Sequence, residues 1–374
     1  MSMKIPFSRP YFTENDVSEI ITLIKQALME GRLTSGTFVK KFEELFAQWL
    51  NIKYAVAVNS ATAALHTVLL ALKIKEGDEV IVPTNTFVST AFSVLYVGAK
   101  PVFADSDEHT FNVSPDDIQN RITPKTKAII VVHLGGNPCD MDPILEIAQE
   151  KGIFVIEDAA HGHGSQYKGK PIGTLGIAGC FSFYPSKIIT TAEGGIVTTN
   201  NKELAERIKI IRNVGRASFG PSGIIQLGYN YRMSEIHAAI GLVQFKHMKE
   251  FVSKRNYLAN QYTKLINKDV SWLIPQKITP NAYSSYYAYI LRMSEDSPFK
   301  DNEELRKYLL SKSIESSILY HPVHMQPYFK SKFGYTDNMY PIAEMLGEKS
   351  IALPLYNGMH EQEIENVVTV LKNA

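Results

Sequence analysis

The chain of 374 residues is too long for one small core and long enough for two domains, one of them with a substantial α/β core. Its composition, 45% hydrophobic and 21% charged, is typical of a soluble globular protein and argues against disorder. The formal net charge of +1 gives no broad attraction to nucleic acid or to anionic membranes, so neither is expected as a partner.

Two further features narrow the class of protein. The cysteines, Cys139 and Cys180, are too few for a disulfide framework or for a zinc site of their own, and no metal site is expected. No apolar run approaches the roughly 18–20 residues needed to span a bilayer. The start, MSMKIPFSRPYF, lacks the long apolar core of a signal peptide, so a cytoplasmic location is expected.

The first two thirds of the chain alternate between helical and strand patterns. Helical periodicity covers 15–30 and 37–50, and Thr34 or Ser35 in the loop between them could cap the second helix. Short continuous apolar runs predict strands at 54–58, 79–82, 101–104, 128–132, 154–156, 180–184 and 195–199. Helical patterns accompany them at 62–72, 88–97, 114–122, 141–151 and 202–212. The predicted fold class is α/β, with a mostly parallel central sheet flanked by helices on both faces.

The remaining third has another character. Residues 213–232 are rich in Gly, Asn and Tyr and indicate an ordered functional loop, and one long helix from 234 to about 265 follows. A strand-like stretch and two further helices then indicate a small α+β domain, at 286–293, 301–312 and 361–372. We therefore expect a large α/β domain over 1–250 and a smaller C-terminal α+β domain over 251–374.

The segment 153–187 carries the strongest chemical signal. An apolar strand ends in the carboxylate of Asp158, and Lys187 follows after a second apolar stretch that contains Ser182. A lysine in apolar surroundings favours the neutral amine that can form an imine with the aldehyde of pyridoxal phosphate (PLP), and an acid can pair with the pyridine nitrogen. Ser182 could bind the phosphate, while Glu157 should point to the opposite face of the strand and have a structural role.

Other positions allow two interpretations each. The segment around Thr62 lies between a strand and a helix, where it could bind a phosphate or simply cap the helix through Ser60. Phe87 follows the next strand at its carboxyl end, where it could stack on a ligand ring or pack in the core. His161 is expected beside the cofactor, and His163 is expected to be a hydrogen-bonded loop histidine.

Eight motifs carry a resemblance to a known family. In chain order they are NSATAAL, PTNTFVST, EDAAHGHGS, SFYPSK, AEGGIV, RNVGR, LGYNYRMSE and LPLYNGMHEQEI. Together they resemble the PLP-dependent nucleotide-sugar aminotransferases, the DegT-type family of the aspartate-aminotransferase fold (fold type I). The resemblance runs from about Pro6 to the C-terminus. Any one motif is a weak signal, but eight in order are specific.

The resemblance implies roles for individual residues. Lys187 would bind PLP covalently and move the proton between cofactor and sugar, Asp158 would pair with the pyridine nitrogen, and Phe87 would stack on the ring. His161 takes a position beside the cofactor where many members carry Gln, which makes a transfer of substrate from those members unsafe. The implied phosphate contacts are Ala61, Thr62, Ser182 and, from the neighbouring subunit of a homodimer with shared active sites, Asn230. The candidates for substrate binding are Arg232, Tyr320, His321 and His324.

The expected activity is therefore the transfer of an amino group from glutamate to a keto-deoxy sugar of a nucleotide sugar, with C4 favoured over C3. The product would be an amino sugar for polysaccharide or glycoconjugate biosynthesis. Related sugar dehydratases have a histidine where this chain keeps Lys187, which favours amino transfer. The alternatives are a ketocyclitol aminotransferase and a non-catalytic, PLP-binding regulator. A nicotinamide dehydrogenase is set aside because NSATAAL is not a G-x-G-x-x-G turn.

Overall fold

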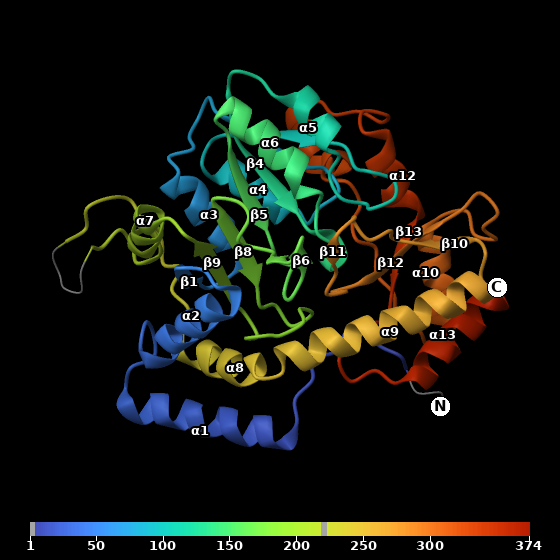
Figure 1. The fold of residues 1–374 in the computed structure, drawn as a ribbon, viewed down its shortest axis with the longest axis horizontal. Helices are drawn as coiled ribbons and strands as arrows, with labels where there is room; N and C mark the ends of the chain where they lie inside the picture. Colours follow the sequence, from blue (N-terminus) through green and yellow to red (C-terminus); the bar gives the residue numbers. More distant parts are fainter. Residues whose placement is uncertain (1–3, 218–222) are drawn as a thin grey trace.

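A mixed sheet forms the centre of the molecule in the computed structural model, which describes residues 4–217 and 223–374 (Figure 1). Strand β9 runs antiparallel to both of its neighbours, β1 and β8, and the remaining pairs are parallel. In spatial order the seven strands are β1 (Tyr54–Val58), β9 (Gly195–Thr199), β8 (Ala178–Ser182), β5 (Phe154–Asp158), β4 (Thr126–Val132), β2 (Glu79–Pro83) and β3 (Lys100–Ala104). The seven predicted strands are present, with ends that differ by at most two residues.

Helices cover both faces of this sheet, and alternate strand residues enter two separate cores. In β4, Ile129 and Val131 belong to one hydrophobic cluster, whereas Ala128 and Ile130 belong to the other. The first cluster takes in α2 (Thr37–Leu50), α5 (Pro115–Arg121), α6 (Met141–Lys151) and α8 (Glu235–Phe245). The second takes in α3 (Ala61–Ala71), α4 (Ser89–Tyr96) and α7 (Lys202–Arg212). This arrangement confirms the predicted α/β class.

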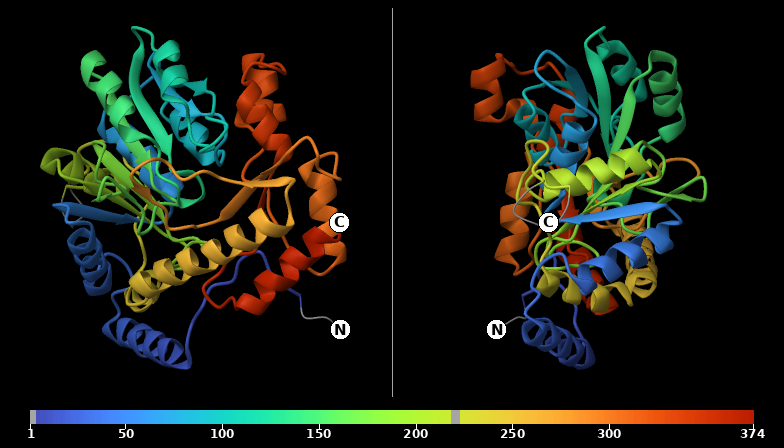
Figure 2. Two further views of the ribbon diagram at one scale, coloured as in Figure 1. Left: turned by 45° about the vertical axis from the view of Figure 1, so that its right-hand side comes forward. Right: turned by 90° about the vertical axis from the view of Figure 1, so that its left-hand side faces the viewer.

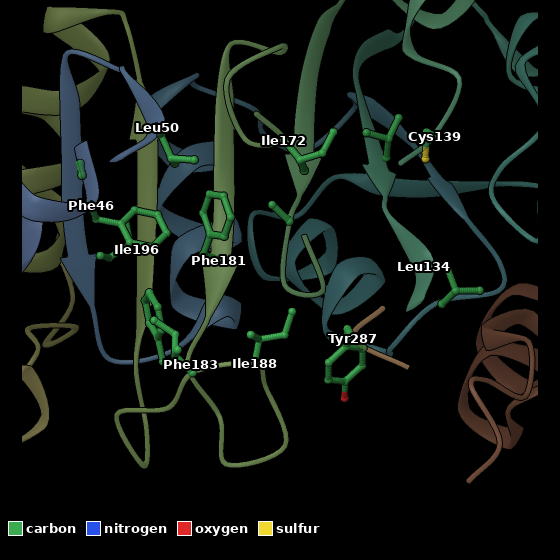
Figure 3. Close-up of a cluster of buried hydrophobic side chains, with 14 of the residues drawn as sticks. Phe46, Leu50, Leu134, Cys139, Ile172, Phe181, Phe183, Ile188, Ile196 and Tyr287 are labelled. Carbon is green, nitrogen blue, oxygen red and sulfur yellow. The ribbon is translucent and has the colours of Figure 1, made fainter. Parts of the chain in front are cut away.

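Aromatic rings fill the first cluster between α2 and the sheet (Figure 3). Phe46 of α2 meets Phe181 of β8 edge to face, with 4.9 Å between ring centroids, and meets Phe183 at 5.6 Å. Such edge-to-face pairs contribute about 0.5–1.5 kcal/mol each beyond the burial of their area. The residues that follow β8 are therefore held firmly from one side.

The N-terminal helix α1 (Glu14–Glu30) lies outside α2 and packs on α8 (Figure 1). The predicted single helix over 234–265 is wrong, because α8 ends at Phe245 and α9 (Met248–Asp269) begins after a turn. At this turn Lys246 binds Glu19 and His247 binds Asp16, so α1 holds the break in place.

The N-terminus of α2 has an unexpected cap. Its N-cap residue is Gly36, and no side-chain hydrogen bond comes from the cap itself, so the suggestion of Thr34 or Ser35 is wrong. Instead the carboxylate of Glu235 accepts hydrogen bonds from the backbone N–H groups of Gly36, Phe38 and Val39, at 2.8–3.0 Å. A Cβ on Gly36 would lie 2.7 Å from this carboxylate, which explains the glycine.

The C-terminal region builds a second, smaller sheet on one side of the molecule (Figure 2). Its elements are η2 (Val323–Met325), β10 (Leu273–Pro275), β12 (Tyr289–Met293), β13 (Ser350–Leu353), α10 (Asn302–Ser311), α11 (Pro327–Phe333), α12 (Pro341–Lys349) and α13 (Glu361–Lys372). A hydrophobic cluster of their own packs these strands against α9 and α13. We propose on this basis a domain division near residue 250. Ile5 joins the same cluster, so the N-terminal segment reaches this region as well.

Two short connections complete the fold. β6 (Gln166–Tyr167), β7 (Lys170–Pro171) and β11 (Ala282–Tyr283) form a third small sheet that ties the segment before β12 to the large domain. The short helix η1 (Leu134–Gly136) follows β4. Within 4–217 and 223–374 no helix is long and apolar enough to cross a membrane.

The cap on α2 gives a stability prediction. Glu235→Ala leaves three backbone donors at a buried helix end without their acceptor, so we expect the free energy of unfolding to fall by about 2–3 kcal/mol. The control is Glu44→Ala, on the exposed side of the same helix, which should change stability by less than about 0.5 kcal/mol. Urea unfolding at neutral pH measures both, and an equal effect of the two substitutions would contradict the capping role.

Candidate active site

A cavity of about 510 Å³ opens at the carboxyl ends of the parallel strands, the edge where open α/β sheets bind their ligands. Residues at or just after the ends of β1, β2, β5 and β8 line the cavity, and the C-terminal region adds Ser317, Leu319 and Tyr320 to its wall. Eight residues singled out in the sequence line it: Ala61, Thr62, Phe87, Asp158, His161, Ser182, Lys187 and Tyr320. Residues far apart in the chain thus meet at one site.

Asp158 lies at the end of β5 and is only 6% exposed. Its carboxylate accepts hydrogen bonds from the Thr90 hydroxyl at 2.8 Å and from the Ala160 amide at 3.2 Å. Burial raises the pKa of Asp158, although these bonds and the nearby charge of Lys187 act in the opposite direction. A basic group placed against this carboxylate would restore its ionised form.

Glu157 points to the other side of β5, as predicted from strand alternation. Its two oxygens accept hydrogen bonds from the amides of Gly173, Leu175 and Gly176 at 2.7–2.8 Å, and His133 lies 3.2 Å away. A fully buried carboxylate with this many donors has a structural role. It fixes the turn that leads into β8.

Lys187 follows β8 in a tight turn, in which its amide donates to the carbonyl of Tyr184 at 2.9 Å. The Nζ atom lies 4.4 Å from the ring centroid of Tyr287, a buried residue just before β12. The hydroxyl of Tyr287 is 3.1 Å from the hydroxyl of Ser186. The lysine amine is thus held inside the cavity against an aromatic face.

His161 is buried between aromatic residues of the C-terminal region. Its ring stacks on Tyr287 with 4.0 Å between centroids, and its Nε2 atom lies 3.2 Å from the Tyr320 hydroxyl. The Gly135 amide donates to Nδ1 at 3.4 Å, which assigns the proton to Nε2. Burial, together with the nearby charge of Lys187, lowers the pKa of His161 well below its ordinary value. The side chain is neutral at physiological pH.

The opposite wall of the cavity offers groups suited to a phosphate. Ser60 caps α3 by accepting a hydrogen bond from the Ala63 amide at 3.1 Å, and the Thr62 hydroxyl bonds Ser89 at 2.9 Å. A Cβ on Gly195 would lie 2.5 Å from the Ser60 backbone, so glycine is required where β9 meets this turn. A helix N-terminus lined with hydroxyls attracts anions.

These features match PLP group by group. A buried carboxylate suits the pyridine nitrogen, an amine suits the aldehyde, and a helix N-terminus suits the phosphate. Phe87, which is 56% exposed at the cavity, offers a ring face. Thr90 and Tyr287 belong to the same constellation but were not predicted. The only signal for Thr90 was its place three residues after Phe87, and Tyr287 gave no signal beyond a strand pattern.

Four predicted residues do not line the cavity of the single chain: Asn230, Arg232, His321 and His324. His324 is fully buried, with its ring nitrogens 2.6 Å from the Thr84 hydroxyl and 3.1 Å from the Glu344 carboxylate. In the single chain His324 is therefore a buried bridge between two segments and lies outside the cavity. Arg232 donates to the Asn213 side chain at 3.0 Å, and Asn230 pairs with the same residue through the backbone.

His163 also differs from the expectation of a hydrogen-bonded loop residue. It is fully buried among Phe46, Phe181 and Phe183, and neither ring nitrogen has a hydrogen-bond partner among the described residues. Burial, and secondarily the charge of Lys187, lowers the pKa of His163 from 6.5 to about 3. The residue therefore acts as a neutral aromatic member of the core.

Comparisons with known proteins agree with this fold. GDP-perosamine synthase of Escherichia coli O157:H7 is 39% identical over 362 residues, which are 96% of this chain and 95% of that protein. The structure of S. venezuelae DesV in complex with a ketimine intermediate superposes with a TM-score of 0.92 at 29% identity, covering 100% of this chain and 98% of that one. Spr1654 of Streptococcus pneumoniae, solved in a PLP form, gives 0.92 at 30% identity over 99% and 98%.

Fold, cavity and comparisons together define a PLP-dependent aminotransferase that acts on sugars. A match to a family model supports the same assignment. The chain belongs to the DegT/DnrJ/EryC1/StrS aminotransferase family, whose model matches residues 14–372.

The arrangement of Lys187 and Asp158 gives a prediction about cofactor binding. Lys187→Ala should abolish the visible absorption of the covalently bound cofactor and lower turnover by about 10²–10⁴-fold or more, because no other amine lines the cavity described for residues 4–217 and 223–374. Lys187→Arg keeps the charge and should fail equally. Asp158→Asn should keep the band but lower turnover. Absorption spectra with added PLP decide this, and a band that survives Lys187→Ala would contradict it.

Burial of His163 gives a prediction about pH. Its folded-state pKa is about 3 and its unfolded-state pKa about 6.5, so the unfolded state takes up the proton first and stability is lost as pH falls through that window. His163→Phe should remove this loss. We expect the variant to lose about 2 kcal/mol less than the wild type between pH 8 and pH 5. Urea unfolding at both pH values measures the difference, and equal losses would refute it.

Proposed function

We propose that the protein transfers an amino group from glutamate to a keto-deoxy sugar carried on a nucleotide, at C4 rather than C3. The product is an amino sugar for polysaccharide or glycoconjugate biosynthesis, made in the cytoplasm. The observation that carries this proposal is the convergence of Lys187, Asp158 and the N-terminus of α3 on one cavity. The similarity to GDP-perosamine synthase supports a nucleotide-linked sugar as the substrate.

Each residue of the site has its own role in this reaction. PLP, when bound, supplies an aldehyde that carries the amino group and a ring that accepts electron density. Asp158 holds a proton on the pyridine nitrogen, and Thr90 fixes the orientation of that carboxylate. In each half of the reaction the Nζ atom of Lys187 would act as general base and general acid, moving a proton between the substrate carbon that bears the nitrogen and a carbon of the cofactor. Ala61, Thr62 and Ser182 hold the phosphate, and Phe87 covers the ring.

His161 and Tyr320 form the side of the cavity that the substrate meets. Since His161 is neutral and its Nε2–H points at the Tyr320 hydroxyl, the pair offers hydrogen bonds without a net charge. A second hollow of about 430 Å³ shares Phe87 and Tyr320 with the cavity and includes His321. We assign it to the part of the substrate that lies beyond the reacting sugar. His324 braces this segment from within and does not contact the substrate.

A second copy of the chain completes the proposed site. Asn230 lies outside the cavity of its own chain, in the segment that pairs with Asn213. We propose that Asn230 of each subunit binds the cofactor phosphate of the other, in a homodimer with shared active sites. Arg232, two residues further on, is the candidate for the carboxylate of the amino donor. Both assignments require that this segment of each subunit extends into the active site of the other subunit.

The function is tested by following nitrogen from donor to product. With PLP and ¹⁵N-glutamate, we expect a nucleotide-linked 4-keto-deoxy sugar to yield an amino sugar with ¹⁵N on C4, identified by mass spectrometry and NMR. A 3-keto isomer and a ketocyclitol serve as matched acceptors, and the Lys187→Ala variant is the control for catalysis. Label on C3 overturns the regiochemistry, and label in the cyclitol alone overturns the substrate class. PLP binding without label in any acceptor favours the non-catalytic regulator.

A further inference from the structure

A closed circuit of contacts surrounds the lysine turn and runs through Tyr287, Arg255 and Asn357, three residues that have no role in the proposed function. It begins at Tyr287, which is 8% exposed and precedes β12. The ring of Tyr287 faces the Nζ atom of Lys187 at 4.4 Å and stacks on His161 at 4.0 Å. Its hydroxyl lies 3.1 Å from that of Ser186, the residue before the lysine. One side chain therefore contacts three residues of the site.

The backbone of Tyr287 is fixed by a buried arginine. Arg255 of α9 is 2% exposed, and its guanidinium donates to the carbonyl groups of Tyr287 at 3.1 Å and Leu355 at 3.1 Å. Its Nε–H donates to the side-chain oxygen of Asn357 at 2.8 Å. The amide nitrogen of Asn357 in turn donates to the carbonyl of Ile188 at 3.0 Å. The circuit thus returns to the residue after Lys187.

We propose that Tyr287 is a positioning residue for the Lys187 amine, held in place by Arg255 and Asn357. The turn that carries Lys187 follows β8, whereas Tyr287 belongs to the C-terminal region, and both residues line the cavity. An aromatic face attracts an ammonium group and removes some of the rotamers of a long lysine side chain. The amine is then directed into the cavity rather than free to turn along its wall.

This arrangement explains why a polar network is buried so far from solvent. Arg255 makes four hydrogen bonds to Asn357 and to backbone carbonyls of two separate segments. Burial lowers the pKa of Arg255 to about 10, so the group keeps its charge at neutral pH. A buried charge with these partners keeps the two segments at a fixed separation, because any displacement leaves donors unpaired.

The test uses the cofactor-free protein, so it does not depend on the proposed function. Limiting acetic anhydride acetylates the lysines, and peptide mass spectrometry gives the rate at Lys187 relative to the exposed lysines of the same molecule. Tyr287→Leu removes the aromatic face, and Tyr287→Phe keeps it and loses only the hydroxyl. The matched controls are Tyr289→Leu and Tyr289→Phe. Tyr289 is the first residue of β12 and is also buried, but its ring stacks on Tyr262.

We expect Tyr287→Leu to raise the relative acetylation rate of Lys187 about fivefold and Tyr287→Phe to change it less than about twofold. Both Tyr289 variants should match the wild type. In the holoenzyme, Tyr287→Leu should lower kcat while the KM for each substrate changes little. A wild-type acetylation rate in Tyr287→Leu overturns the proposal. Absence of turnover in the wild type would refute the proposed function and leave the acetylation result to stand.

A second variant covers the case in which Tyr287→Leu does not fold. Asn357→Asp keeps the acceptor for Arg255 and removes the donor to the carbonyl of Ile188. The turn that contains Lys187 then loses its hydrogen bond from residue 357, while the buried Arg255 keeps its own. We expect the acetylation rate of Lys187 to rise at least about twofold. An unchanged rate in this variant also overturns the proposal.

Discussion

The structure depends on one constraint, the alternation of side chains at the end of β5. Glu157 and Asp158 are adjacent and both buried, and the strand directs them to opposite faces of the sheet. Glu157 binds three amides of the turn before β8 and so fixes the position at which that strand starts. Asp158 faces the cavity, held by Thr90. The turn that contains Lys187 directly follows β8. By fixing the start of β8, Glu157 therefore helps to set the distance between Asp158 and Lys187.

The cavity needs both parts of the molecule. The parallel strands present their carboxyl ends to it, which supplies the acid, the lysine turn and the helix N-terminus. The C-terminal region supplies the opposite wall through Tyr287 and Tyr320, which contact His161 from two directions. A shift of the C-terminal region relative to the sheet would therefore change the surroundings of the Lys187 amine. The buried Arg255 of α9 is linked to the lysine turn through Asn357, whose amide nitrogen donates to the carbonyl of Ile188.

The sequence predicted the sheet well because its strands are buried on both faces and appear as short continuous apolar runs. The large-domain residues of the cavity were found because each closely follows a strand end. The features that could not be predicted from the sequence depend on contacts between residues that are far apart in the chain. The break before Met248 is hidden within continuous helical periodicity and is visible only through the contacts of His247 with α1. Likewise, neither the cap by Glu235 nor the contact of Tyr287 with Lys187 has a local sequence pattern, since each joins residues at least 100 positions apart.

The family resemblance in the sequence puts His161 at a position where glutamine is expected in many members, and the surroundings of His161 show how a histidine fits there. A glutamine side chain offers one donor group and one acceptor, both uncharged. A neutral imidazole offers the same, and burial together with Lys187 keeps His161 neutral. The Gly135 amide uses its acceptor, and Tyr320 receives its donor. The substitution therefore preserves the electrostatics at the cofactor side and adds a planar ring that stacks on Tyr287. Any change in substrate preference should arise from this added ring, which couples the cavity wall to the residue facing the lysine, and not from a new charge.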